Sequence, residues 1–159
     1  PSIEKAARQG NPKAVDFPRS MLGPDSLDFS FSGLKTAVLY HCRGHDMKGE
    51  SRVGLMSPQE IADIAASFQA AVVEVLVAKT LRAADRVGAR TVVLGGGVAA
   101  NSALREALQQ ACNENGLILL VAPKSLCTDN AVMVASLAYP LFQAGRFADL
   151  SLEPASSSE

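Results

Sequence analysis

The 159-residue chain has almost no net charge, −1 at pH 7, and its small basic excess is confined to residues 1–52. Such a balance creates no electrostatic field that would steer a polyanion toward the protein. If the substrate is RNA, much of the phosphate contact must therefore come from elsewhere. Hydrophobic residues make up 48% of the chain and charged residues 19%, a composition that suits one compact domain.

Cysteine is also scarce. Cys42, Cys112 and Cys127 are odd in number, far apart and without a C-x-x-C pair, which argues against a disulfide framework and a zinc ribbon and fits a reducing cytoplasm. The chain lacks a signal-peptide pattern at its start and a run of about 18 apolar residues. We therefore expect no membrane span.

The most informative stretch is residues 91–105. Aliphatic residues lead into Gly95, Gly96 and Gly97, and Asn101 then opens an amphipathic run. This pattern predicts a strand, a glycine turn and a helix, an arrangement that lets an anion approach backbone N–H groups. It is neither a G-x-G-x-x-G motif nor a Walker A loop. Spacing alone leaves a nucleotide phosphate site and a turn that is glycine-rich for packing as equal alternatives.

The first third of the chain predicts short elements. Residues 1–10 have the spacing of a short helix, and several prolines interrupt the segment after it. Residues 15–17 and 20–22 are expected to be short extended pieces, and residues 27–31 alternate strictly, as a strand does. A helix is expected from residue 34 onward, after the turn Ser32-Gly-Leu-Lys-Thr36. Residues 46–56 have no sustained period, which is typical of a loop.

The rest of the chain predicts longer elements. Ser57-Pro-Gln-Glu60 is a capping box that opens a helix of some 30 residues ended by Gly88, long enough for us to expect a kink or break. Its broad apolar stripe suits burial against a sheet. Residues 92–94 and 117–121 are apolar throughout and separated by a helix, which predicts a parallel sheet covered on both faces. A last helix is expected over residues 131–144.

Three segments resemble, in the same order, motifs of the TsaD family, the tRNA threonylcarbamoyladenosine transferases once called O-sialoglycoprotein endopeptidases or glycoproteases. They are Phe29-Ser-Phe-Ser-Gly-Leu-Lys-Thr36, Gly95-Gly-Gly-Val-Ala-Ala-Asn-Ser-Ala-Leu-Arg105 and Cys127-Thr-Asp-Asn-Ala-Val-Met-Val-Ala135. The opening residues resemble the family just after a Gly-Gly dipeptide. We therefore expect residues 1–154 to be a C-terminal lobe of a longer protein and residues 155–159 a disordered tail.

The resemblance implies an α/β fold, an RNase H-like lobe of the actin, Hsp70 and sugar-kinase superfamily, with a mixed sheet flanked by helices. It implies transfer of a threonylcarbamoyl group from threonylcarbamoyl-adenylate to N6 of the adenosine 3′ of the anticodon in tRNAs that read ANN codons. In that family Asn101 would contact the adenylate or ATP, and Gly95, Gly96 and Gly97 would let the nucleotide lie against the backbone. The implied partners are tRNA, a catalytically inert paralogue and a small ATPase, without a membrane.

The resemblance also implies that Asp129 is a metal ligand, together with two histidines of the absent N-terminal half, around iron or zinc. From the residues alone, Thr128 or Asp129 could instead cap the following helix. His41 and His45 are four apart, yet we expect them to be exposed or capping residues, because the family's His-x-x-x-His motif lies upstream. Lys35 could meet a phosphate or be a solvated lysine, and we assign it no chemical step.

Two other functions stay open. The older family name suggests a metalloprotease, but the chain has no H-E-x-x-H motif and no Ser/His/Asp set. A non-catalytic scaffold of the same fold is the other alternative, although such a paralogue would be expected to lose Asp129. Because the two metal histidines and the first phosphate loop are missing, we expect this chain alone to bind metal poorly and to turn over little.

Overall fold

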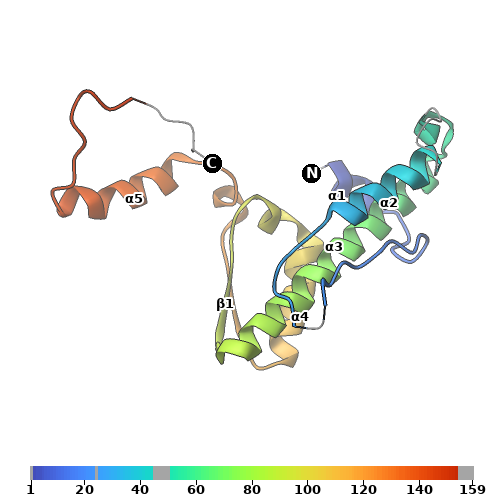
Figure 1. Ribbon diagram of the computed structural model, residues 1–159, viewed down its shortest axis with the longest axis horizontal. Coiled ribbons are helices and arrows are strands. Elements are labelled where there is room, and N and C mark those ends of the chain that lie inside the picture. The colour runs from blue at the N-terminus through green and yellow to red at the C-terminus, as the bar shows by residue number, and fades with distance from the viewer. Residues whose placement is uncertain (1, 24, 45–50, 154–159) are drawn as a thin grey trace.

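The computed structural model describes residues 2–23, 25–44 and 51–153. Figure 1 shows a bundle of helices beside a short sheet, with one further helix extending away from both. The elements in chain order are α1 (Ser2–Ala7), α2 (Ser32–Arg43), η1 (Arg52–Leu55), α3 (Pro58–Val87), β1 (Thr91–Leu94), η2 (Gly97–Ala100), α4 (Ser102–Glu114), β2 (Ile118–Val121), η3 (Lys124–Leu126) and α5 (Ala131–Gln143), where η marks a 3-10 helix.

Helix α3 is the longest element and both its ends are capped as predicted. The Ser57 side chain accepts the Glu60 N–H at 3.2 Å, and the Glu60 carboxylate accepts the Ser57 N–H at 2.7 Å. Gly88 ends the helix in the left-handed conformation, with φ 61°. The helix is unbroken over its 30 residues, so the expected break is absent, because no glycine or proline follows Pro58 within it.

Helix α3 forms the core by packing mainly against α1 and α4, rather than against the strands as predicted. By length and composition it could also cross a membrane, since one 18-residue window has a mean hydropathy of 1.8. However, it carries other helices along its length (Figure 1), and its side chains Ser67, Ala71, Val75 and Lys79 are almost completely buried. This is the environment of a core helix.

The predicted parallel sheet is confirmed. Strands β1 and β2 pair in parallel, from Thr91 opposite Ile118 to Leu94 opposite Val121, and α4 connects them. Only one face is covered. On the other face Val93 is 74% exposed and Leu120 is 54% exposed, so the expectation of cover on both faces is wrong for the described residues. These two strands also show only parallel pairing, not the mixed sheet that we expected.

Residues 15–17, 20–22 and 27–31 were predicted to be extended or strand segments, and none of them forms a strand. A strand needs a neighbouring strand for its backbone hydrogen bonds. Here, side chains of α3 donate hydrogen bonds to backbone carbonyls of the segment instead. Lys79 donates to the Asp28 carbonyl, and Arg82 donates to the Ser26 carbonyl at 3.2 Å. Phe17 lies in a buried cluster with Leu34 and Ala71, which joins this segment to α2 and α3.

Helix α5 is present as predicted, and it has no buried residue. It extends away from the helical bundle in Figure 1, with apolar side chains such as Val134 and Leu137 about 70% exposed. Together with the open face of the sheet, α5 leaves a large apolar surface uncovered in this chain. The predicted tail, residues 155–159, lies outside the described residues.

Candidate functional site

The glycine turn after β1 is open to solvent. Gly95, Gly96 and Gly97 are exposed, and a Cβ added to any of them would meet no atom within 4 Å. Only Gly96 has a positive φ, 87°, that itself favours glycine. Packing within the described residues therefore does not account for three glycines in succession. The open space lets a ligand lie directly against the backbone.

Asn101 follows this turn and is the N-cap of α4. Its Oδ1 accepts the Leu104 N–H at 2.9 Å, and its Nδ2 donates to Oε1 of Gln69 on α3 at 2.8 Å. The cap holds the side chain at the positive end of the helix dipole, where backbone donors attract an anion. The side chain is half-buried, so it has a fixed orientation beside the exposed glycines.

Charged residues from two other elements also reach the start of α4. Oε1 of Glu4, on α1, accepts the Ser102 N–H at 3.1 Å, and Nζ of Lys124, on η3, donates to Oγ of Ser102 at 2.8 Å. The hydrogen bond from the Ser102 backbone N–H lowers the pKa of Glu4 most, and the hydrogen bond from the Ser102 side chain lowers it further. The positive charges of Lys124 and Arg8 act in the same direction. Glu4 is therefore an anion already bound at this helix end.

Sequence reasoning did not find Glu4, Gln69 or Lys124 as neighbours of this site. They lie 98, 32 and 22 residues from their partners at residues 101 and 102. No short motif or period in the sequence connects positions so far apart. The only available signal was that Glu4 lies in the opening segment that resembles the family.

Asp129 lies in the loop before α5 and its side chain is exposed. The prediction that Thr128 or Asp129 could cap the last helix is wrong, because Oδ1 of Asn130 accepts the Met133 N–H at 3.1 Å and forms the cap. The carboxylate of Asp129 is thus not used in capping. Carboxylate oxygen suits iron or zinc, but among the described residues no three metal-ligating side chains cluster, so Asp129 could supply only part of a metal site.

The other predicted candidates lie apart from this region. Lys35 is exposed in the first turn of α2, and His41 is exposed in the last turn of the same helix, as expected. The His41 ring packs edge-on against Phe17 at 5.8 Å. His45 lies outside the described residues. All three cysteines are free, which agrees with the absence of a disulfide framework.

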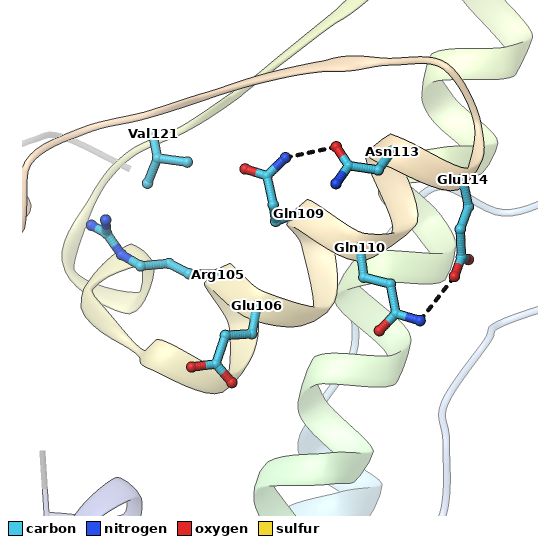
Figure 2. Close-up of a pocket in the computed structure, with 7 residues that line it drawn as sticks. All are labelled: Arg105, Glu106, Gln109, Gln110, Asn113, Glu114 and Val121. Atoms are coloured by element: carbon cyan, nitrogen blue, oxygen red, sulfur yellow. Dashed lines mark hydrogen bonds between the residues drawn. The ribbon is translucent and has the colours of Figure 1, made fainter.

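A groove of about 570 Å³ runs along α4 next to β2 (Figure 2). Its polar lining is already bonded in part, since Gln109 donates to Asn113 at 2.9 Å and Gln110 donates to Glu114 at 2.8 Å. The groove does not include the glycine turn, Asn101 or Asp129. We therefore do not assign the functional site to it.

Comparison with known proteins identifies the family. The model of the family TsaD, tRNA N6-adenosine threonylcarbamoyltransferase, matches residues 1–136. A protein of that name from Moorella thermoacetica is 52% identical over 157 residues, which cover 96% of this chain and 42% of the relative. A relative from Desulfitobacterium hafniense is 52% identical over 87% of this chain and 39% of its own length. One from Symbiobacterium thermophilum is 50% identical over 96% of this chain and 42% of its own length. The chain thus spans about two fifths of the length of these relatives.

Proposed function

This chain belongs to the TsaD family of tRNA N6-adenosine threonylcarbamoyltransferases, and from that membership we propose that it is the C-terminal lobe of such an enzyme. The reaction is transfer of a threonylcarbamoyl group from threonylcarbamoyl-adenylate to N6 of the adenosine 3′ of the anticodon in tRNAs reading ANN codons. The N6 nitrogen bonds to the carbamoyl carbon, the bond from that carbon to the phosphate oxygen breaks, N6 loses a proton, and AMP leaves. The observation that carries the proposal is the family match over residues 1–136.

In this proposal residues 1–154 form an RNase H-like lobe of the actin, Hsp70 and sugar-kinase superfamily, with the nucleotide between two lobes. The β1–α4–β2 unit supports it, since a ligand in a parallel sheet binds beyond the carboxyl ends of the strands. Both the glycine turn and the Asp129 loop follow such strand ends. The fold by itself also hosts kinases, so the function depends on the family match.

The residues of the site have separable tasks. Gly95, Gly96 and Gly97 give the adenylate access to the backbone, and Asn101, held by its bonds to Leu104 and Gln69, contacts it beside that turn. Asp129, with ligands from the longer protein, would hold one iron or zinc ion, which supplies Lewis-acid polarisation when bound. The contribution of this chain to rate is then mainly to fix the adenylate relative to the acceptor.

The proposed setting is a cytoplasmic enzyme that works with tRNA, an inert paralogue of the same fold and a small ATPase. The net charge of −1 makes long-range attraction of tRNA to this lobe weak. We therefore assign much of the phosphate contact to the rest of the assembly.

Nucleoside mass analysis tests the proposal. Unmodified tRNA is incubated with threonine, bicarbonate, ATP, the adenylate-forming enzyme, the partner proteins and this chain extended to the length of its relatives. Threonylcarbamoyladenosine is expected, and Asn101→Ala and Asp129→Ala should each suppress it, whereas Lys35→Ala should not. A folded, metal-loaded protein that gives no product would favour the scaffold alternative.

A further inference from the structure

One side chain connects the glycine turn to the loop that carries Asp129. Arg105, in the first turn of α4, donates from Nε to the Ala99 carbonyl at 2.5 Å. Its Nη2 donates to the Ala122 carbonyl at 2.7 Å and lies 3.2 Å from Sγ of Cys127. Ala99 belongs to η2, Ala122 follows β2, and Cys127 follows η3. The guanidinium therefore contacts three separate segments of the chain.

The Cys127 end of this connection is well fixed. The residue is 3% exposed, and its Sγ also lies 3.4 Å from the Pro123 carbonyl, which can accept the thiol proton. Cys127 precedes Asp129 by two residues, so the position of the carboxylate depends on where this buried thiol is held. The hydrogen bond from Lys124 to Ser102 connects the same loop to α4 a second time.

The other end of this connection, at Ala99, lies within the glycine turn region. Ala99 is 1% exposed and lies between the glycines and Asn101. The backbone N–H of Arg105 also bonds to the Asn101 carbonyl at 3.2 Å, so Arg105 belongs to the turn that Asn101 caps. A displacement of the guanidinium would thus shift both the glycine turn before Asn101 and the loop that carries Asp129.

We propose that Arg105 is a positioning residue that sets the adenylate-binding turn, residues 95–101, relative to the metal-ligand loop, residues 127–130. This inference rests on the proposed function of those two segments. The planar guanidinium has donors in fixed directions, and here they reach acceptors in three segments at once. Lysine has one flexible ammonium and cannot reproduce that geometry.

The consequence is a coupling between two ligands that do not touch. Adenosine lacks the phosphate through which the adenylate would reach a metal, so an effect of Zn²⁺ on adenosine affinity that Arg105→Lys removes is carried by the protein. In the chain extended to the length of its relatives, we expect Zn²⁺ to tighten adenosine binding by about fivefold or more. Arg105→Lys should bring the ratio of adenosine affinities with and without Zn²⁺ close to one. The exposed Arg86, in the last turn of α3, gives the control variant Arg86→Lys, which should keep it.

Calorimetric adenosine titrations with and without Zn²⁺ measure the ratio, and thermal unfolding confirms that each variant is folded. A uniform structural weakening would lower both affinities and leave the ratio unchanged. Should Arg105→Lys not fold, Cys127→Ala removes one of the three side-chain contacts of Arg105, together with the thiol contact to the Pro123 carbonyl, and should reduce the ratio part of the way. An unaltered ratio in the folded variants, or no coupling in the parent protein, overturns the role of Arg105. If Asn101→Ala does not weaken adenosine and Asp129→Ala does not weaken Zn²⁺, the proposed site itself is wrong.

Discussion

Gly10 lies where the segment after α1 passes against the backbone of α3. A Cβ on this residue would be 2.0 Å from the Ala62 carbonyl oxygen, a distance that no rotamer change can relieve. We expect Gly10→Ala to lower the free energy of unfolding by about 2 kcal/mol or more, because the backbone must shift. Gly33→Ala is the matched control, since a Cβ on that helical residue meets nothing within 4 Å. Urea unfolding of the two variants measures the difference, and equal midpoints would refute the close approach.

Glu74 contributes a pH-dependent part of stability. Arg19 donates to its two carboxylate oxygens, from Nε at 2.7 Å and from Nη2 at 3.1 Å, and this hydrogen bonding lowers the pKa of Glu74 below its ordinary value of 4.5. A lowered folded pKa gives stability that is present above 4.5 and lost as the pH falls through the folded value. The pair is partly exposed, so we expect at most about 1 kcal/mol.

The measurement is urea unfolding of the parent chain and Glu74→Gln at pH 7 and pH 3. The two should differ at pH 7, and the difference should shrink as the pH falls from 4.5 toward 3, while the exposed Glu106→Gln serves as the control and should match the parent chain at both pH values. A difference that is the same at both pH values would show that the carboxylate charge is not involved.

Individual site residues could be predicted from the sequence only where a motif contains them. Residues 91–105 predicted a strand, a glycine turn and a helix, and the structure adds that Asn101 is the N-cap of that helix. The contact of Asn101 with the adenylate was implied only by the family resemblance and stays a prediction. The cap of the last helix was assigned one or two residues too early, because Thr, Asp and Asn are all good N-caps and adjacent here. Gln69 could not be found, since its contact with Asn101 depends on how α3 packs against α4.

Among the elements, the segment before α2 depends on a buried lysine. Lys79 is 1% exposed, donates to the Asp28 carbonyl, and lies 5.5 Å from the centre of the Phe29 ring. Lys79→Met keeps the length of the side chain and removes the charged donor. We expect chymotrypsin to cleave after Phe29 about tenfold faster in this variant, because a hydrogen bond from a charged group is lost.

Lys35→Met, at an exposed site on α2, is the control and should be cleaved at the parent rate. Faster cleavage of Lys79→Met with an unchanged unfolding midpoint would show local loosening. If the segment is cleaved no faster, Lys79 does not anchor it.

Element prediction succeeded where local signals were sufficient. The capping box specified the start of α3, and Gly88 specified its end. Residues 27–31 alternate as a strand does, yet strand formation needs a partner, and within the described residues the segment instead meets side chains of α3. Apolar runs predicted the parallel pairing of β1 and β2, but they could not show which face α4 would leave open.

For the molecule as a whole, the uncovered apolar surface predicts association. Val93, Ile118 and Leu120 are 74%, 59% and 54% exposed on one face of the sheet, and α5 adds a helix with no buried residue. Contiguous apolar surface of this kind marks an interface or an aggregation risk. We expect the chain alone to bind 8-anilinonaphthalene-1-sulfonate, and Val93→Asn with Leu120→Asn to reduce binding without lowering the unfolding midpoint.

The buried Leu108 gives the contrasting control, since Leu108→Asn should lower the midpoint and raise dye binding. Dye binding that is unaffected by the two outer-face changes would place the exposed apolar surface elsewhere.

The central claim is that this chain carries the adenylate-binding turn and one ligand of a metal site that the longer protein completes. Zinc stoichiometry by equilibrium dialysis tests it most directly, with the chain alone, the chain extended to the length of its relatives, and Asp129→Ala in the extended form. A lone carboxylate binds zinc weakly, so we expect tight binding of one zinc only in the extended form and its loss in Asp129→Ala. One tightly bound zinc in the chain alone, or an extended protein unaffected by Asp129→Ala, would contradict the account.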